Sequence, residues 1–196
     1  MADPQLLDFV FHGGRPCLDL FNTVRRRKDP YSQTQDLLAE TDGFREWLLK
    51  AQRQAGWATL YPPLSTSAAQ NPVPAGIQNQ AIELRNLIGR FLTRACSADD
   101  IETVNQLAQA RPCWQLSTDG GALSAQDNLE LEGALGVIAE DCAHLFASDL
   151  SRNIKECAEE RCGIVFLDKS NGAQRHWCSM KECGNRSKAS RHYHRH

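Results

Sequence analysis

The sequence predicts an α+β fold that is mainly α, with a helical N-terminal domain containing a small β-hairpin and a compact C-terminal module after it. Three observations predict this architecture. Apolar residues recur at helical spacing over much of the first 150 positions, one glycine-centred turn interrupts that pattern, and four cysteines gather in two pairs near the end. With 196 residues, 41% of them hydrophobic and 23% charged, the chain suits one core plus a small appendage. We therefore expect two domains, residues 1–150 and 151–196.

The first elements are predicted from a glycine turn and a proline. Residues 6–10 predict a short strand that ends at the glycine pair 13–14. Pro16 then suits the first turn of a helix that reaches about Val24.

A second helix and a long loop follow. Thr41 or Asp42 can cap a helix whose apolar residues recur at spacings of three and four. Its inward face comprises Phe44, Trp47 and Leu48. Residues 62–76 contain four prolines and no apolar period, so we expect an exposed loop there, as a linker or an insertion.

The rest of the first domain predicts three helices and the hairpin. Apolar residues mark one helix over 84–95, and Asp99 or Asp100 caps another over about 101–107. Residues 113–123, with Asp-Gly-Gly at their middle, predict the β-hairpin. A last, long helix is predicted by the spacing of Leu131, Leu135, Ile138, Cys142 and Leu145.

The basic charge of the chain is concentrated in its C-terminal part. The formal net charge is −2, but residues 1–150 carry 12 Lys and Arg against 19 Asp and Glu, whereas residues 151–196 carry 10 against 5. The two parts therefore have net charges of −7 and +5. From Lys169 onward there are seven basic residues and one acidic residue, Glu182, a distribution that suits a polyanionic partner.

Four of the eight cysteines form a metal-binding pattern. They fall in two pairs that lie fifteen residues apart, each with four residues between its cysteines, whereas the other four are scattered singly. Tetrahedral zinc takes four soft ligands at about 2.3 Å, and two short loops that each offer two thiolates meet that geometry with little strain. The sequence therefore predicts one structural zinc ion. Its ligands are Cys157, Cys162, Cys178 and Cys183.

This spacing is typical of treble-clef-like or ribbon-like zinc modules. Residues 163–177 predict a β-hairpin, with strands over 163–167 and 174–177 and a turn at 170–172. A segment of about forty residues has too little core to fold alone, so we expect the metal to supply much of its stability. The alternatives are four unligated cysteines in a helical tail, or a catalytic zinc. Four thiolates favour a closed structural site, because a catalytic site keeps one position open for water.

Common catalytic and membrane signatures are missing from the sequence. There is no GxxxxGK, GxGxxG, HExxH or GxSxG motif, so we expect no enzyme. Asp19 and Asn22 leave an enzyme conceivable, but a polar pair that bonds and caps the backbone is the simpler interpretation. No apolar stretch approaches the ~20 residues that cross a bilayer, and no export signal is recognisable. We therefore expect a cytoplasmic protein without membrane contact, whose cysteines are reduced or bound to metal.

Two segments resemble a known family. The residues RHWCSMKECGNRSKASRH, with FLDKS upstream, closely resemble the signature of the bacterial CGNR zinc finger family, named for Cys-Gly-Asn-Arg, here residues 183–186. The segment GGRPCLDLFNT, residues 13–23, resembles the opening of the ABATE domain that members of this family carry. This sequence has His176 where the resemblance leads us to expect an arginine before the tryptophan. The resemblance spans nearly the whole chain, and it implies a stress-induced transcription regulator.

The leading functional hypothesis is a DNA-binding transcriptional regulator. The zinc module would grip DNA, while the acidic domain would sense a small-molecule effector or a protein partner, or form a homodimer. If residues 183–196 are helical, most of their basic side chains share one face. The predicted nucleic-acid contacts are Arg175, Lys181, Lys188, Arg191, His192 and Arg195. Arg186 falls on the opposite face and is expected to be structural, packing beside Tyr193 or bonding loop carbonyls.

Two other functions stay open at this point. The module can be a protein-interaction finger whose basic helix is a solvated face. It can also bind RNA, with Trp177 and Tyr193 stacking on bases. Trp177, which lies next to a predicted ligand, is more simply part of the small core of the module.

Overall fold

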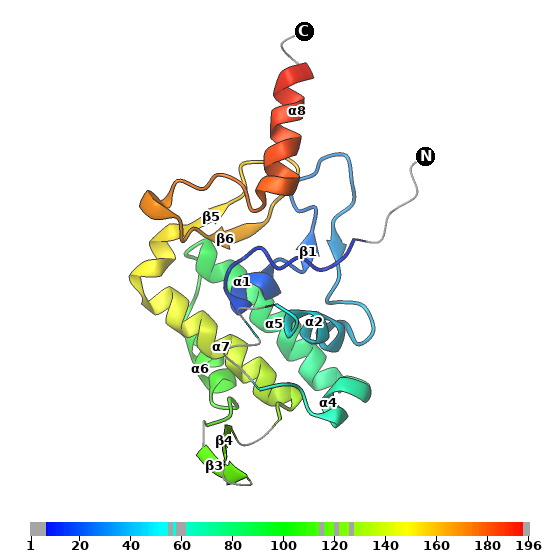
Figure 1. Ribbon diagram of the computed structural model, residues 1–196, viewed down its shortest axis with the longest axis vertical. Coiled ribbons are helices and arrows are strands. Elements are labelled where there is room, and N and C mark those ends of the chain that lie inside the picture. The colour runs from blue at the N-terminus through cyan, green and yellow to red at the C-terminus, as the bar shows by residue number, and fades with distance from the viewer. Residues whose placement is uncertain are drawn as a thin grey trace.

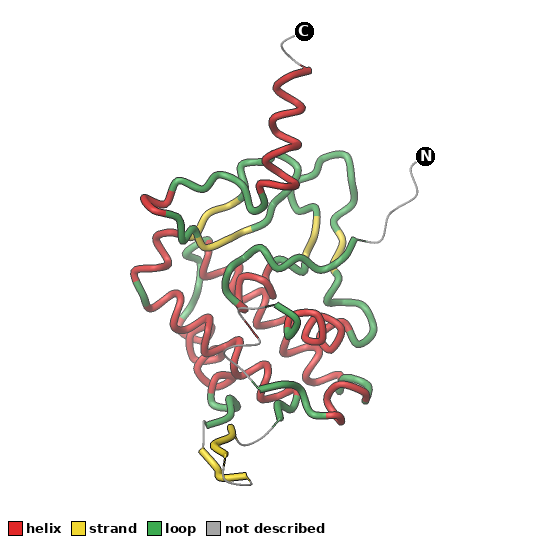
Figure 2. Tube along the Cα trace, in the orientation of Figure 1, coloured by secondary structure: helices red, strands yellow, loops and turns green. Residues whose placement is uncertain are grey.

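The computed structural model describes residues 7–54, 57, 62–113, 116–119, 122–125 and 128–193. Helices make up most of this part of the chain, and the strands form small two-stranded sheets (Figure 2). The predicted α+β class, mainly α, is therefore confirmed. Among the described residues, no helix combines the length and the apolar character that crossing a bilayer requires.

Helix α7 is the centre of the helical body. It spans Leu131–Ala147 and is buried over most of its length. Helices α1 (Pro16–Phe21), α5 (Ala75–Leu92) and α6 (Ala98–Ala108) pack against it, as Figure 1 shows. Helix α2 (Gly43–Ala51) adds the buried aromatic side chains of Phe44 and Trp47, whose rings stack with their centroids 6.3 Å apart.

The N-terminal segment differs from its prediction. Residues 7–10 form no strand, and residue 6 lies outside the described part of the chain. Helix α1 stops at Phe21, because Asn22 and Thr23 direct their side chains to backbone groups. The next residues form β1 (Val24–Arg25), which pairs antiparallel with β2 (Gln35–Asp36).

The proline-rich segment is not simply an exposed loop. It contains a short helix, α4 (Thr66–Gln70), capped by the hydroxyl of Ser65, which accepts a hydrogen bond from the backbone N–H of Ala68. Leu64 is buried and forms a β-bridge with Leu129. The prediction failed because a five-residue helix is too short to show an apolar period.

Two helix caps also differ from their predictions. Asp42 stands at the N-cap of α2, but its carboxylate accepts from the N–H of Val73 at 2.7 Å instead of capping the helix. Helix α6 begins after Ser97, which forms a capping box with Asp100, so Asp100 occupies the third helical position.

The predicted hairpin of the first domain is present. Strands β3 (Leu116–Asp119) and β4 (Ala122–Ala125) pair antiparallel, with Asp119 opposite Ala122. The glycine turn that was predicted to join them lies outside the described residues. The last predicted helix of this domain is α7, which begins at Leu131.

The C-terminal module pairs different strands from those predicted. After a 3-10 turn, η1 (Asp149–Asn153), strand β5 (Ile154–Glu156) pairs antiparallel with β6 (Val165–Leu167). Residues 174–177, predicted as the return strand, form no strand, and η2 (Asn171–Ala173) lies in the turn before them. A π-helical turn, η3 (Met180–Gly184), then leads into α8 (Asn185–Tyr193).

Asp168 explains why no return strand forms. This buried carboxylate accepts hydrogen bonds from Lys155 Nζ at 2.9 Å, from Ser170 Oγ at 2.6 Å and from the N–H of Arg175 at 2.8 Å. These bonds fold residues 169–175 back over the end of β6. Burial raises the pKa of Asp168, but the hydrogen bonds outweigh it and hold that pKa well below its usual range.

Strand β6 belongs to two cores at once. Val165 and Leu167 lie in the hydrophobic core of the helical body, whereas Phe166 lies in a second cluster with the paired cysteines. This follows from the alternation of side chains along a strand. The helical body and the C-terminal module therefore share a strand.

Candidate metal centre

The structure brings the four paired cysteines together. Cys157 and Cys162 lie in the connection between β5 and β6, Cys178 precedes η3, and Cys183 lies within it. All four sulfur atoms lie within 4.8 Å of one another. Cys162 is half-buried, and the other three are buried.

The spacing of the sulfur atoms fits one tetrahedral zinc ion. Cys178 Sγ lies 3.6 Å from Cys162 Sγ and 3.6 Å from Cys183 Sγ. A tetrahedron with Zn–S bonds of about 2.3 Å has sulfur–sulfur edges of about 3.8 Å, whereas a disulfide needs about 2.05 Å. The chemistry of the donor set agrees, because four thiolates form a closed, structural zinc site.

Two N–H groups support the sulfur ligands. The backbone N–H of Cys178 donates to Cys157 Sγ at 3.4 Å, and Arg186 Nη2 donates to Cys183 Sγ at 3.3 Å. Such donors stabilise thiolates and orient them toward a metal. Arg186 therefore has a structural contact, as predicted, but its partner is a ligand sulfur instead of a loop carbonyl. Its guanidinium also lies 3.9 Å from Glu159 Oε1.

The thiols strongly influence one another's ionisation. Hydrogen bonds with Cys157 and Cys162, together with burial, raise the pKa of Cys178 far above its usual range. The hydrogen bond with Cys157 likewise raises the pKa of Cys162 to about 12, whereas bonds from Cys162 and Cys178 lower the pKa of Cys157. Four thiolates this close need a compensating cation, which a divalent zinc ion supplies on binding.

The N-terminal glycine motif holds the zinc module against the body. Gly13 O accepts the N–H of Leu167 at 2.8 Å. The buried side chain of Asn22 donates to Val165 O at 2.8 Å and accepts the N–H of Val165 at 2.9 Å. Asn22 thus bonds β6 as a neighbouring strand would. This confirms that Asn22 is a backbone-bonding residue.

Asp19 has the same kind of role within the motif. Its carboxylate accepts the N–H of Gly13 at 2.7 Å, and a Cβ at Gly13 would lie only 2.8 Å from that carboxylate oxygen. The close approach explains why glycine occupies this position. Burial raises the pKa of Asp19 to about 7, against an ordinary value of 3.8.

A basic cavity lies beside the sulfur cluster. Its volume is about 320 Å³, and it is lined by Cys162, Cys178 and Cys183 together with several basic side chains. These are His12, Arg25, Arg26, Arg161 and Arg186. Arg161 is fixed there by Asp29, whose two carboxylate oxygens each lie 2.9 Å from its guanidinium. Nothing in the sequence spacing of residues 25–28 connects them to the cysteines, so the contribution of Arg25 and Arg26 becomes visible only in the structure.

The predicted nucleic-acid contacts occupy different positions in the structure. Lys181 and Lys188 are exposed, on η3 and α8. Arg175 instead donates to Trp177 O at 2.8 Å and to Cys178 O, and its guanidinium lies 4.5 Å from the centroid of the Phe166 ring. Its donors therefore hold the cysteine loop. The side chains of Arg191 and His192, and all of Arg195, lie outside the described part of the chain.

The environment of Trp177 agrees with its simpler interpretation. The ring packs against the cluster formed by the cysteines, Ile164 and Phe166. Trp177 thus belongs to the small core of the module, as predicted.

Comparison with protein families identifies both parts of the chain. Residues 14–149 match the ABATE family, described as "putative stress-induced transcription regulator", and residues 153–196 match the CGNR zinc finger. A comparison with curated protein sequences finds no match. The paired cysteines are thus those of a CGNR zinc finger, and their geometry fits one structural zinc.

Proposed function

The chain belongs to the ABATE family, and from that premise we propose that it is a cytoplasmic transcriptional regulator that binds DNA through its zinc finger. The helical body would receive the signal from a small molecule, a protein partner or a second copy of the chain. The proposal assigns no catalytic step to either part.

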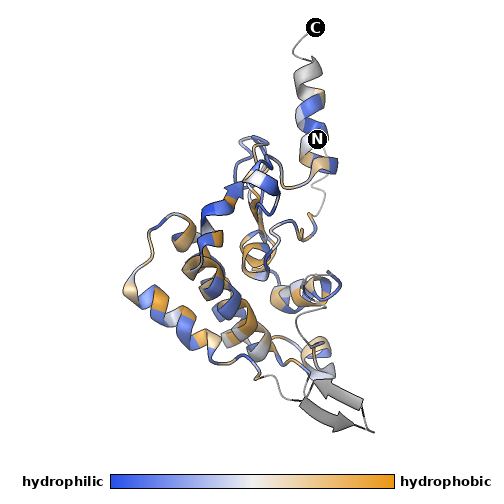
Figure 3. Cartoon of the chain, turned by 60° about the vertical axis from the view of Figure 1, so that its left-hand side comes forward, coloured by the Kyte–Doolittle hydropathy of each residue, from blue (hydrophilic) through white to orange (hydrophobic). Residues whose placement is uncertain are grey.

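The projection of α8 is the observation that carries the proposal. This helix leaves the body at the zinc module and extends away from the other helices (Figure 1), and hydrophilic residues predominate along its described length (Figure 3). Lys188 on the helix and Lys181 before it are exposed. A basic helix held at one end by a rigid metal site is a suitable shape for entering a groove of DNA.

The basic cavity extends this surface. Arg25 and Arg26 come from the N-terminal part of the chain, yet they line the same cavity as Arg186 in the first turn of α8. The residues that would meet phosphates therefore come from both sides of the predicted domain boundary.

Fluorescence anisotropy with a labelled random duplex tests the proposal on the full chain. We expect binding at low salt, with log Kd rising by about 0.9 per log unit of salt for each phosphate contact. The double variant Lys181→Ala, Lys188→Ala should reduce that slope by roughly 1 to 2 while the zinc content stays unchanged. Lys50→Ala on α2 is the control, because it removes a lysine charge outside the proposed surface and should leave the slope unaltered.

The other outcomes separate the alternatives. Stronger binding to a single-stranded or duplex RNA of matched sequence would favour the RNA hypothesis. An absence of binding to either nucleic acid at low salt would refute the proposal and favour a protein-interaction finger. The test requires the full chain, because removing the helical body would expose Val165 and Leu167.

A further inference from the structure

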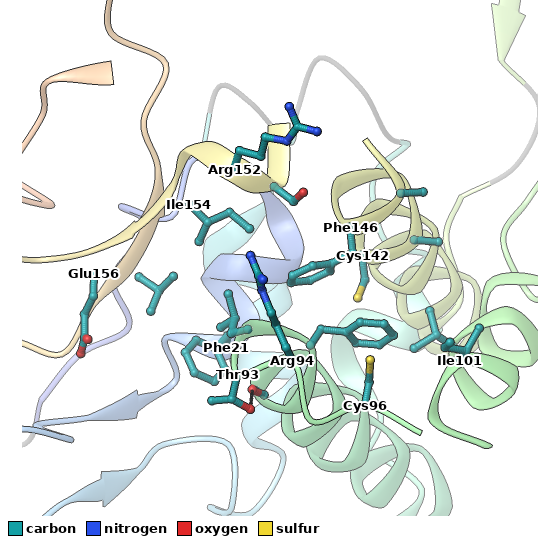
Figure 4. Close-up of a pocket in the computed structure, with 18 of the residues that line it drawn as sticks. Phe21, Thr93, Arg94, Cys96, Ile101, Cys142, Phe146, Arg152, Ile154 and Glu156 are labelled. Carbon is teal, nitrogen blue, oxygen red and sulfur yellow. Dashed lines mark hydrogen bonds between the residues drawn. The ribbon is translucent and has the colours of Figure 1, made fainter. Parts of the chain in front are cut away.

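A large cavity lies between the helical body and the zinc module, away from the sulfur cluster. Its volume is about 940 Å³, and its walls come from the end of α5, from α6, from α7 and from β5 (Figure 4). Phe91 and Phe146 form an aromatic pair in its wall, with ring centroids 5.1 Å apart, and Ile101 and Phe21 add further apolar surface. A cavity of this size and composition is typical of sites for small organic ligands, which span about 300–1,000 Å³.

The charged side chains around this cavity are mainly basic. Its charged lining residues are Arg27, Arg94, Arg152, Lys155 and Glu156. Lys155 is paired with Asp168 at 2.9 Å, and Glu156 with Lys28 at 2.7 Å. Arg152 pairs with Asp149 at 3.2 Å, but both side chains are more than four-fifths exposed, so the pair is weak.

Arg94 has an unusual backbone conformation that places it at the cavity. It follows the C-cap of α5 with a φ of +57°, in the left-handed region where glycine or asparagine is the relaxed choice. Its side chain extends into the space between Phe21, Phe146 and Arg152, as Figure 4 shows. Within the part of the chain that the structure describes, Arg94 forms no ion pair. Arg94 is exposed, so its guanidinium is free to meet a negatively charged ligand that enters the cavity.

We infer that this cavity binds a small amphipathic organic anion. An aromatic or aliphatic body lies against Phe91 and Phe146, and a single anionic group of the carboxylate or sulfonate type lies between Arg94 and Arg152. Guanidinium groups recognise such anions through paired, charge-assisted hydrogen bonds.

The position of the cavity connects the ligand with the metal centre. Ile154 and Glu156 of β5 line it, and the next residue is the zinc ligand Cys157. Val165 of β6 lines it as well. An effect of this ligand on DNA binding rests on the proposed function, but the binding of the ligand itself does not. The two can therefore be tested separately.

A pair of fluorescent probes tests the binding on the zinc-loaded full chain. 8-Anilinonaphthalene-1-sulfonate carries the anionic group, and N-phenyl-1-naphthylamine has the same aromatic body without it. We expect the sulfonate to bind with 1:1 stoichiometry and more tightly than the neutral probe. This order is opposite to the one that hydrophobicity alone would produce.

Two variants locate the site, and a third is the control. Arg94→Gly should weaken sulfonate binding about ten-fold or more through loss of a charge-assisted contact, and leave binding of the neutral probe unchanged. Its melting temperature should not fall, because glycine relaxes the left-handed φ. Ala143→Phe should block both probes by filling the cavity. Arg53→Gly is the control, because it removes the same charge at an exposed position that lines neither this cavity nor the basic cavity, and binding should stay at the wild-type level.

The outcomes decide the inference in either direction. Equal sulfonate affinity in wild type and Arg94→Gly, or equal loss in Arg94→Gly and Arg53→Gly, would overturn it. Tighter binding of the neutral probe than of the sulfonate would overturn the anionic part. Should Ala143→Phe fail to fold, Arg152→Ala replaces it, and that variant should also weaken the sulfonate selectively. A wild-type protein that binds the sulfonate probe but does not bind DNA would count against the proposed function alone.

Discussion

Replacement of Asn22 by alanine removes the side chain that joins the helical body to β6. The wild-type amide makes two hydrogen bonds with the backbone of Val165, at 2.8 and 2.9 Å, and is only 1% exposed. Alanine leaves both backbone groups of Val165 without these partners in a buried setting. The net contribution of two hydrogen bonds, about 2 kcal/mol, is the lower estimate of the loss in the free energy of unfolding. The cost of leaving two buried groups unsatisfied, about 4 kcal/mol, is the upper estimate, so we expect a loss of about 3 kcal/mol.

Urea unfolding followed by circular dichroism measures this loss on the zinc-loaded protein. A decrease of about 3 kcal/mol corresponds to a melting temperature lower by about 6–12 °C for a chain of this size. We also expect faster transfer of zinc to a chelating dye. Asn22 holds Val165 of β6, and the next residue, Phe166, packs in the cluster of the cysteines. Asn71→Ala is the control: its exposed amide bonds Ser67 Oγ at 3.0 Å, and its loss should cost less than about 0.5 kcal/mol.

Two results would refute the reasoning. A free energy of unfolding for Asn22→Ala within about 0.5 kcal/mol of wild type would mean that water or backbone movement satisfies Val165. An unchanged zinc transfer rate would mean that the metal centre does not depend on its attachment to the body.

Three further predictions concern the metal centre and the glycine motif. Elemental analysis should find one zinc ion per wild-type chain and much less zinc in Cys178→Ser. X-ray absorption should show sulfur ligands, and a coordination shell of nitrogen and oxygen would contradict the assignment. Arg186→Ala should release zinc to a chelator faster than wild type through loss of its bond to Cys183 Sγ, whereas Arg186→Lys should be intermediate. The pKa of Asp19 is about 7 in the folded protein and ordinarily 3.8, so between these pH values the folded state binds more protons than the unfolded state. The contribution of Asp19 to stability should therefore fall as pH rises from about 4 to 7. Asp19→Asn should remove that dependence and be more stable than wild type at pH 8, by up to about 4 kcal/mol; parallel pH profiles for the two proteins would contradict this.

Regular elements were predictable because their signals are local. The apolar spacing of α5 and α7 repeats over several turns and identified both helices. Their caps were less predictable, because a side chain such as Asp42 can bond a distant backbone group as readily as its own helix. Helix α4 was not predictable either, because its five residues are too few to show an apolar period.

The zinc ligands were predictable for a different reason. Their chemistry and spacing are specific, so Cys157 and its three partners could be identified without knowledge of the fold. The strand pairing around them was not predictable. It depends on Asp168, a single buried carboxylate whose hydrogen bonds turn the chain where a strand was expected. Likewise, the sequence does not show that Arg175 donates hydrogen bonds to backbone carbonyls. An arginine near a basic helix looks the same in the sequence whether it bonds the backbone or contacts nucleic acid.

The shared strand determines how the two parts of the chain can influence each other. Phe166 faces the sulfur cluster, whereas its neighbours Val165 and Leu167 face the core of the helical body. A strand packed on both faces cannot shift toward one side without opening the other, because protein interiors are close-packed. Strand β5 pairs with β6, lines the large cavity and ends one residue before Cys157. An occupant of the cavity that displaces β5 must therefore alter either the position of Cys157 or the packing of β6. Both Cys157 and Phe166 of β6 lie in one buried cluster with Cys183 of η3, the turn that directly precedes α8.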